Sequence, residues 1–350
     1  MENLYSYVKK YGDRTFKAKE FNDIDNLVFS LLSYLDYSHT SINLGNYTLN
    51  YIGKEYFKLY DYYDIRKLGR SQKDAFKLLE IIIDMPRYKD IVLSDYIYNT
   101  NKNMQFSAIT FNISKNLKYI CFEGTDELIC GWKEDGKLAC EFPVPAHVEA
   151  INYINNQVKL FGANVIVGGH SKGGNLALVS SMFIKSYKRF KIKKIYSNDG
   201  PGLRQEEFNS KQFKKIKNRY IHIVPDSSII GMLLRHNSHT VVKSHIKNIN
   251  CHYLTSWHIK DDKLVLGQLS DKSKRLEKSI IQWIENHSDD DKTKMVDNLF
   301  KVLEDSNIES VPSMTSLKNI FKIIKGIKNI DKQTRDLTID LITNGYLSSK

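Results

Sequence analysis

A short apolar run that stops at a pair of glycines is the feature that most constrains this chain. Residues 165–174 read Val-Ile-Val-Gly-Gly-His-Ser-Lys-Gly-Gly, and apolar residues resume at helical spacing after Asn175. Ser171 therefore lies on a predicted strand-to-helix turn, in the pattern G-x-S-x-G. Because such a turn is sharp, larger side chains at Gly169 and Gly173 would collide with the strand and the helix. The pattern predicts a serine nucleophile. The oxyanion that forms when this serine attacks a carbonyl group would face the N-terminus of the following helix.

The segments around this turn alternate between predicted strands and helices. A helix at 144–160 precedes the turn, and further strands at 195–198 and 219–224 follow it. Strands and helices that alternate at this spacing predict a parallel sheet with right-handed crossovers. We therefore expect an α/β fold of the α/β-hydrolase type, with a mostly parallel sheet flanked by helices. Earlier short runs rich in β-forming residues predict additional strands at 91–93, 96–98, 107–113 and 117–122.

The periodicity divides the chain into three predicted parts. Residues 1–90 form a helical extension packed on the core, with amphipathic helices at 21–35 and 71–84. Residues 91–288 form the α/β core, and residues 289–350 form a charged helical tail. The predicted boundary loop is Asp289–Asp291, and the predicted helices beyond 270 are 273–287, 292–304 and 315–347.

The chain is basic, with a formal net charge of +12. Lysine is spread along its whole length, which is typical of solvated helix faces, so we expect no nucleic-acid partner. The tail carries lysines at helical spacing among isoleucines, at positions 318, 322, 325 and 328. This pattern predicts either a docked or partner-binding helix or a basic membrane-surface helix, and hence at most a weak membrane contact.

The four cysteines include no C-x-x-C pair and predict reduced, buried thiols. No stretch reaches the ~18 to 20 apolar residues that a bilayer span needs, and the first residues do not read as a secretion signal. We expect a cytoplasmic protein that needs no metal and no cofactor.

A reactive serine needs a histidine to accept its proton and a carboxylate to orient that histidine. In sheets of this kind the order along the chain is Ser, Asp, His. Asp226 and Asp199 both follow predicted strands. We favour Asp226, since a strand ends directly before it, whereas Asp199 opens a Gly-Pro-Gly turn. Judged by their positions in the sequence alone, His252 and His258 are equally good candidates for the base.

A set of motifs occurs in a fixed order along the chain. Gly-Thr125 follows an apolar strand, with Trp132 and Asp135 behind it, and G-H-S-K-G comes next. Asp199-Gly-Pro-Gly, Val-Pro-Asp226, and a histidine shortly before Ser-Trp complete the series. The ordered set resembles the class 3 lipase branch of the α/β-hydrolases, and most of all a bacterial family of lipase-3-like proteins without an assigned substrate.

The resemblance implies Ser171 as the nucleophile and His252 as the base. It implies an oxyanion hole formed by the Thr125 region and the N–H of Lys172, and Asp226 falls where the lipases place their acid. One departure is that these lipases usually carry Phe-Arg-Gly-Thr, whereas this chain has Phe-Glu-Gly-Thr at 122–125. The apolar segment 227–234 suits either an acyl-lining loop or a buried helix.

Together these residues predict a serine ester hydrolase of the lipase or esterase type. Its substrate would be a lipid or another small acyl ester, cleaved through an acyl-enzyme on Ser171. The alternative is a non-catalytic interaction protein built on a hydrolase scaffold. In that case the basic tail and the N-terminal helices would be the working surfaces.

Overall fold

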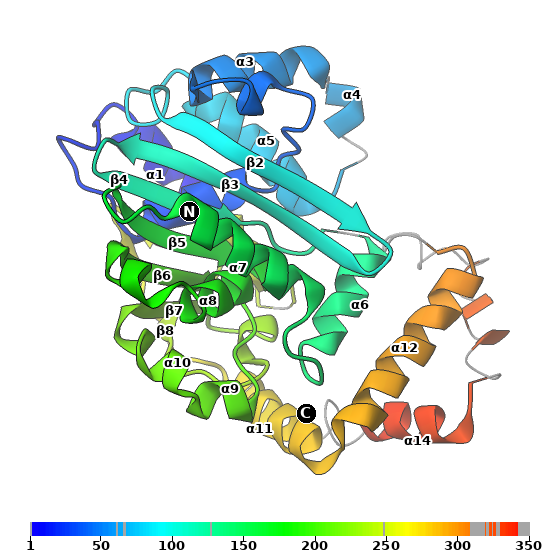
Figure 1. The fold of residues 1–350 in the computed structure, drawn as a ribbon. Coiled ribbons are helices and arrows are strands. Elements are labelled where there is room, and N and C mark those ends of the chain that lie inside the picture. The colour runs from blue at the N-terminus through cyan, green and yellow to red at the C-terminus, as the bar shows by residue number, and fades with distance from the viewer. Residues whose placement is uncertain are drawn as a thin grey trace.

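An eight-stranded sheet forms the centre of the protein, and its strands lie side by side in chain order (Figure 1). The structure is a computed structural model that describes residues 2–60, 62–65, 68–126, 128–247, 249–308, 319, 322–323, 325–326 and 330–341. The strands are β1 (Tyr47–Thr48), β2 (Val92–Asn101), β3 (Met104–Ser114), β4 (Leu117–Phe122), β5 (Asn164–His170), β6 (Ile192–Asn198), β7 (Tyr220–Pro225) and β8 (Thr240–Val242).

The sheet changes direction at β4. Strands β1 to β4 pair antiparallel, and β4 to β8 pair parallel. The parallel half is the expected α/β unit, so the predicted fold class is confirmed. Because parallel strands end at the same edge, the residues that follow β4, β5, β6 and β7 meet there. A separate short hairpin is formed by β9 (Ile259–Lys260) and β10 (Lys263–Leu264).

Helices cover both faces of the sheet. Parallel strands that follow one another in sheet order, joined by right-handed crossovers, place their connecting helices on one face. On that face α7 and α8 pack against alternate sheet residues such as Phe122 and Val167. Side chains of opposite parity, such as Tyr119 and Ile166, point into the core under the N-terminal helices. The helices up to α8 are α1 (Leu4–Tyr11), α2 (Asp23–Leu32), α3 (Leu49–Leu59), α4 (Tyr62–Ile65), α5 (Arg70–Ile82), α6 (Ile129–Lys137), α7 (Pro145–Gln157) and α8 (Lys172–Met182).

Helix α2 is tied to the sheet by buried polar groups. The Asn26 amide donates to Asn198 Oδ1 at 2.8 Å, and the Asn198 amide donates to Ser30 Oγ at 3.0 Å. The Asp25 carboxylate, fully buried, accepts hydrogen bonds from the Arg87 guanidinium. Since a buried charge is tolerated only when it is paired, these contacts fix α2 against the strand end at Asn198.

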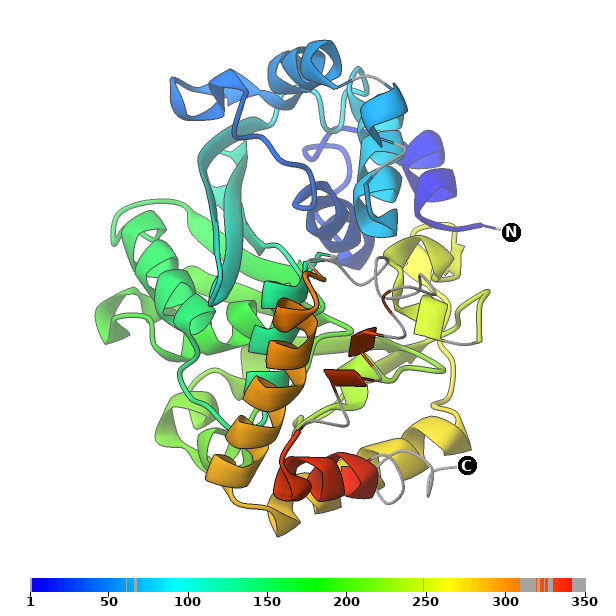
Figure 2. The ribbon, with the colours of Figure 1, turned by 90° about the vertical axis from the view of Figure 1, so that its right-hand side faces the viewer.

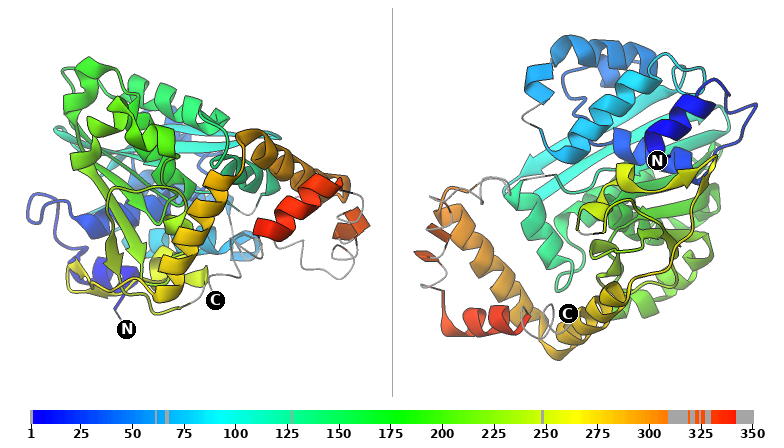
Figure 3. Two further views of the ribbon diagram at one scale, coloured as in Figure 1. Left: turned by 90° about the horizontal axis from the view of Figure 1, so that it is seen from below. Right: turned by 180° about the vertical axis from the view of Figure 1, so that it is seen from behind.

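The C-terminal helices form an arm beside α6 (Figures 2 and 3). The predicted boundary loop at Asp289–Asp291 is wrong, because these residues form the first turn of α12. The Ser288 side chain caps that turn by accepting from the Asp291 N–H at 3.1 Å. Three carboxylates at a helix N-terminus are stabilised by the helix dipole, which explains why an acidic run starts a helix here. The arm consists of α11 (Asp271–Asn286), α12 (Asp289–Asp305) and α14 (Lys332–Asp340).

Part of the predicted tail helix at 315–347, including Lys318 and Lys328, lies outside the described residues. Across the described part of the chain, every helix is too short or too polar to traverse a bilayer. The remaining elements are short: α9 (Gln205–Asn209), α10 (Lys211–Lys214), and the 3₁₀ turns Ser41–Asn43, Ser186–Lys191, Lys217–Arg219, Ile230–Met232, Ile249–His252 and Leu254–Ser256.

Candidate active site

Ser171 occupies the turn between β5 and α8 in a strained backbone conformation, with φ 56° and ψ −130°. The flanking glycines are required by close packing. A Cβ at Gly169 would lie 2.4 Å from the backbone of Gly173, and one at Gly173 would lie 2.1 Å from the Phe122 carbonyl oxygen. The predicted strand-to-helix turn and the collisions expected there are therefore confirmed. The first N–H groups of α8 have no acceptor within the helix and point toward the Ser171 end.

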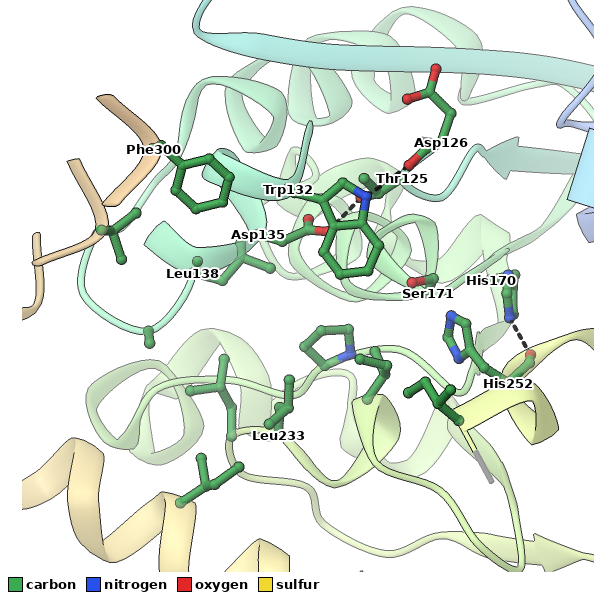
Figure 4. A pocket seen from close by; sticks show the side chains of 18 of the residues that line it. Thr125, Asp126, Trp132, Asp135, Leu138, His170, Ser171, Leu233, His252 and Phe300 are labelled. Atoms are coloured by element: carbon green, nitrogen blue, oxygen red, sulfur yellow. Dashed lines mark hydrogen bonds between the residues drawn. The ribbon is translucent and has the colours of Figure 1, made fainter. Parts of the chain in front are cut away.

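A cavity of about 530 Å³ opens over Ser171. Ser171, His252 and Thr125 line it together, and Figure 4 shows the His252 imidazole facing the Ser171 side chain. The structure therefore brings together three of the residues that the sequence singled out. Thr125, which follows β4, and His252, which ends the 3₁₀ turn Ile249–His252, are 127 residues apart along the chain.

His252 is oriented by Asp199. Its Nδ1 lies 2.7 Å from Asp199 Oδ2, and the Asp199 side chain is 1% exposed. The other carboxylate oxygen of Asp199 accepts from Ser228 Oγ and from the Gly231 N–H. Three contacts hold this carboxylate in one position, so it fixes the Nδ1–H tautomer and leaves Nε2 of His252 available to act as a base.

The preference for Asp226 over Asp199 is corrected by this geometry. Asp226 Oδ2 pairs with Lys247 Nζ, whereas it is Asp199 Oδ2 that meets His252 Nδ1. The physical reason lies in the sheet order. Strand β6, which ends before Asp199, is the neighbour of β5, whereas Asp226 follows β7, one strand further away. The turn-like sequence after Asp199 is real, since Asp199 has φ 49°, and that turn is what directs its carboxylate toward His252.

His170 contacts the backbone of His252, and the sequence did not predict this contact. Its Nε2 lies 2.8 Å from the His252 carbonyl oxygen, and the two imidazole centroids are 4.3 Å apart. Because a carbonyl only accepts, His170 Nε2 must carry the proton. His170 Nδ1 then accepts from the Tyr34 hydroxyl at 2.7 Å. Burial keeps the pKa of His170 well below its ordinary value, so the ring stays neutral and this tautomer persists.

Thr125 is held by Asp135. The distance from Thr125 Oγ1 to Asp135 Oδ2 is 2.5 Å, and the other oxygen, Asp135 Oδ1, is buried with no hydrogen-bond partner among the described residues. Burial raises the pKa of the Asp135 carboxyl to about 6, although the Lys172 charge and the Thr125 hydroxyl act in the opposite direction. Burial therefore destabilises the ionised form of Asp135, which lies beside the expected oxyanion site.

We expect Asp135→Asn to stabilise the protein in a pH-dependent way. The pKa of Asp135 in the folded protein is raised above its ordinary value of 3.8, so the stability that the protonated carboxyl contributes is present at low pH and is lost as pH rises toward 6. A non-titrating asparagine avoids that loss. The variant should therefore gain about 2 kcal/mol in relative free energy of unfolding between pH 4 and pH 7.5. Urea unfolding of both proteins at the two pH values measures this, and a pH-independent difference would contradict the assignment.

Lys172 contributes its backbone and its side chain to different tasks. Its N–H is the first of helix α8, where the resemblance places an oxyanion donor. Its side chain turns away into the protein, where Nζ lies 3.1 Å from Glu134 Oε2 and donates to the Gln105 carbonyl oxygen at 2.9 Å. Both side chains of this ion pair are 1% exposed. No sequence pattern predicts this pair, because a lysine and a glutamate 38 positions apart have no local periodicity.

Glu123, the acidic residue that departs from the lipase pattern, lies away from the reaction site. Residues alternate along β4, so Glu123 continues the face that packs under the N-terminal helices, and it is not among the described residues lining the cavity. Burial raises the pKa of its carboxyl well above the ordinary value. Burial therefore disfavours a negative charge on Glu123.

The cysteines do not offer a competing nucleophile. All four have free thiols, and burial raises the pKa of Cys121 and of Cys251 to about 12. Burial also raises the pKa of Cys130 and Cys140. A thiol that is protonated at neutral pH is a poor nucleophile, so burial disfavours all four cysteines in that role. In the described part of the chain, no group of three or more His, Cys, Asp or Glu side chains could hold a metal ion.

Comparison with protein families identifies the family of this chain. The model of the Mbeg1-like family matches residues 82–301, which is more than half of the chain. This chain belongs to the Mbeg1-like family. The match begins at the end of α5 and includes the whole parallel sheet together with α11 and most of α12. Ser171, His252, Asp199 and Asp226 therefore all lie within the Mbeg1-like region.

Comparison with solved structures includes the crystal structure of M37 lipase, at 13% sequence identity and a TM-score of 0.33. That likeness covers 61% of this chain and 70% of the lipase chain. It is too distant to transfer any residue or activity. A search of curated proteins found no match. The Mbeg1-like protein is thus placed by family and by its α/β-hydrolase type of fold, and its chemistry must be argued from its own side chains.

Proposed function

We propose that this protein is a serine hydrolase that cleaves carboxylic esters through an acyl-enzyme on Ser171. The observation that carries the proposal is the 2.7 Å contact between His252 Nδ1 and Asp199 Oδ2 beside a serine in a strained strand-to-helix turn. A histidine with one nitrogen fixed by a buried carboxylate and the other facing a serine is the arrangement that activates a hydroxyl.

The reaction proceeds in two halves. In the first, Ser171 Oγ attacks the ester carbonyl carbon while His252 Nε2 accepts the hydroxyl proton, and Asp199 stabilises the resulting imidazolium. The tetrahedral oxyanion accepts from the Lys172 N–H and from the Thr125 region. His252 then protonates the leaving alcohol. In the second half, His252 activates a water that hydrolyses the acyl-enzyme, which releases a carboxylic acid and restores Ser171.

The resemblance to lipase-3-like bacterial proteins supports the same reading, and assignment to that narrower family is part of the proposal. We take the site to need no cofactor, since every proton in the two steps is carried by His252. The opposing reading, a non-catalytic interaction protein, predicts that changes at Ser171 are silent and that deletions beyond residue 290 are not.

Hydrolysis of p-nitrophenyl butyrate by the full-length protein tests the proposal. We expect turnover by the wild type and a loss of at least about 10³-fold in kcat for Ser171→Ala. Ser238→Ala is the matched control, because Ser238 is exposed. Equal turnover by wild type and Ser171→Ala would exclude Ser171 as the nucleophile and would favour the interaction-protein reading.

Tyr34→Phe should separate positioning of the base from simple stability. Without the hydroxyl, Nδ1 of His170 is buried without a donor, which costs about 1–3 kcal/mol of unfolding free energy. Because His170 holds the His252 carbonyl, we also expect kcat to fall by up to about 10-fold with KM unchanged. Tyr37→Phe is the control: Tyr37 is equally buried and donates to the Leu32 carbonyl oxygen at 3.1 Å, remote from the base. Similar stability losses but equal kcat values in the two variants would contradict the positioning role.

A further inference from the structure

The cavity over Ser171 extends well beyond the reacting groups, and its far part is apolar. Figure 4 shows Phe300 and Leu138 at the end opposite Ser171 and His252, with Leu233 forming the floor between them. The volume of about 530 Å³ is within the ~300–1,000 Å³ typical of small-molecule sites. A serine needs little space for attack on an ester carbonyl, so this extension is available for the substrate itself.

The C-terminal arm supplies much of that apolar wall. Helix α11 contributes Ile280, Trp283 and Ile284, and α12 contributes Met295, Leu299 and Phe300. The arm begins after the last strand of the sheet, so these residues are additional to the α/β unit that carries Ser171. Among the wall residues, aromatic and flexible apolar side chains predominate, which suits a hydrocarbon rather than a polar group.

We infer that α11 and α12 build an acyl chamber, and that the substrate is an ester of a long-chain fatty acid whose chain extends from Ser171 toward Phe300. This inference rests on the proposed function. The lining also includes Arg70, Ser71 and Gln72 at the start of α5, and the Arg70 guanidinium lies over the ring of Tyr253, the residue after His252. The cavity is therefore polar on the His252 side. The acyl chain therefore lies toward the arm, and the alcohol part of the ester lies toward α5.

Contacts between α12 and α6 hold the arm in place and so maintain the shape of the chamber. Val296 packs against Gly136 of α6 so closely that a Cβ at Gly136 would lie 3.2 Å from Val296 Cγ1. Asp297 pairs with Lys137 at 3.2 Å and with Lys133 at 3.6 Å. Each exposed pair contributes little energy, but together with the apolar contact they fix the rotation of α12 that turns Leu299 and Phe300 inward.

A chamber of this kind predicts chain-length selectivity that a larger side chain in the wall would remove. Leu299→Trp narrows the chamber from α12, and Ile280→Trp narrows it from α11. Each should lower the ratio of kcat/KM for p-nitrophenyl palmitate to kcat/KM for p-nitrophenyl butyrate by at least about tenfold. Lys301→Trp is the matched control, because it places the same side chain at an exposed position of α12.

Binding gives a readout that does not depend on catalysis. Ser171→Ala should bind cis-parinaric acid, a fluorescent long-chain fatty acid, and adding Leu299→Trp or Ile280→Trp should weaken binding at least about tenfold while Lys301→Trp does not. Equal binding by all these proteins, or none by Ser171→Ala, would overturn the acyl chamber. Butyrate turnover that depends on Ser171 without any palmitate selectivity would also overturn it, yet would leave the proposed ester hydrolase intact.

Discussion

Replacing Asp199 by asparagine is expected to lower kcat for ester hydrolysis by about 10⁴-fold, the loss seen when a serine triad keeps its shape but loses its carboxylate. Asparagine fills the same space beside Nδ1 of His252, but it can present an amide N–H there. That would favour the wrong imidazole tautomer, with the proton on Nε2, where it blocks proton transfer from Ser171. Turnover of p-nitrophenyl butyrate at saturating substrate measures the change.

Asp226→Asn is the matched control. Asp226 contacts Lys247 rather than His252, so the substitution removes an ion pair whose lysine is largely exposed and should change kcat by less than about threefold. Comparable losses in both variants would mean that neither carboxylate acts through His252. A large loss in Asp226→Asn alone would restore the assignment that the sequence favoured.

His252→Ala should lower kcat by at least about 10³-fold, because Ser171 then has no group to accept its proton. His258→Ala, which the sequence alone could not distinguish from it, should retain near wild-type kcat. His258 packs against His245, with ring centroids 4.8 Å apart, and it is not among the described residues that line the cavity. If His258→Ala were the inactive variant, the structure would have the wrong histidine at the site.

The predictable parts of the fold are those that a local pattern of residue types indicates. The strand at 165–169 and the helix after Ser171 follow from an apolar run, two glycines and helical spacing, and the structure has them as β5 and α8. The short strand β8, Thr240–Val242, carries too few residues to show a period and was not predicted. Asp289–Asp291 was misread because an acidic run is typical both of loops and of helix N-termini.

The residues of the candidate site likewise fall into those that the sequence predicts and those that it does not. Ser171 is marked by its own neighbours, and His252 by the family resemblance. The choice between Asp199 and Asp226 depends on which strand lies next to β5, which the order of segments along the chain does not determine. Tyr34 is 136 positions from its partner His170, so no sequence pattern could have linked them. The same holds for the α11 and α12 side chains around the cavity, which read as ordinary amphipathic helices.

Covalent labelling tests the central claim most directly. We predict that a fluorophosphonate probe modifies the wild-type protein, that mass spectrometry of its peptides places the adduct on Ser171, and that Ser171→Ala is not labelled. Labelling should also slow strongly in His252→Ala and Asp199→Asn, since both leave the hydroxyl without an effective base. Absence of an adduct from the folded wild-type protein, or an adduct on any other residue, would contradict the account.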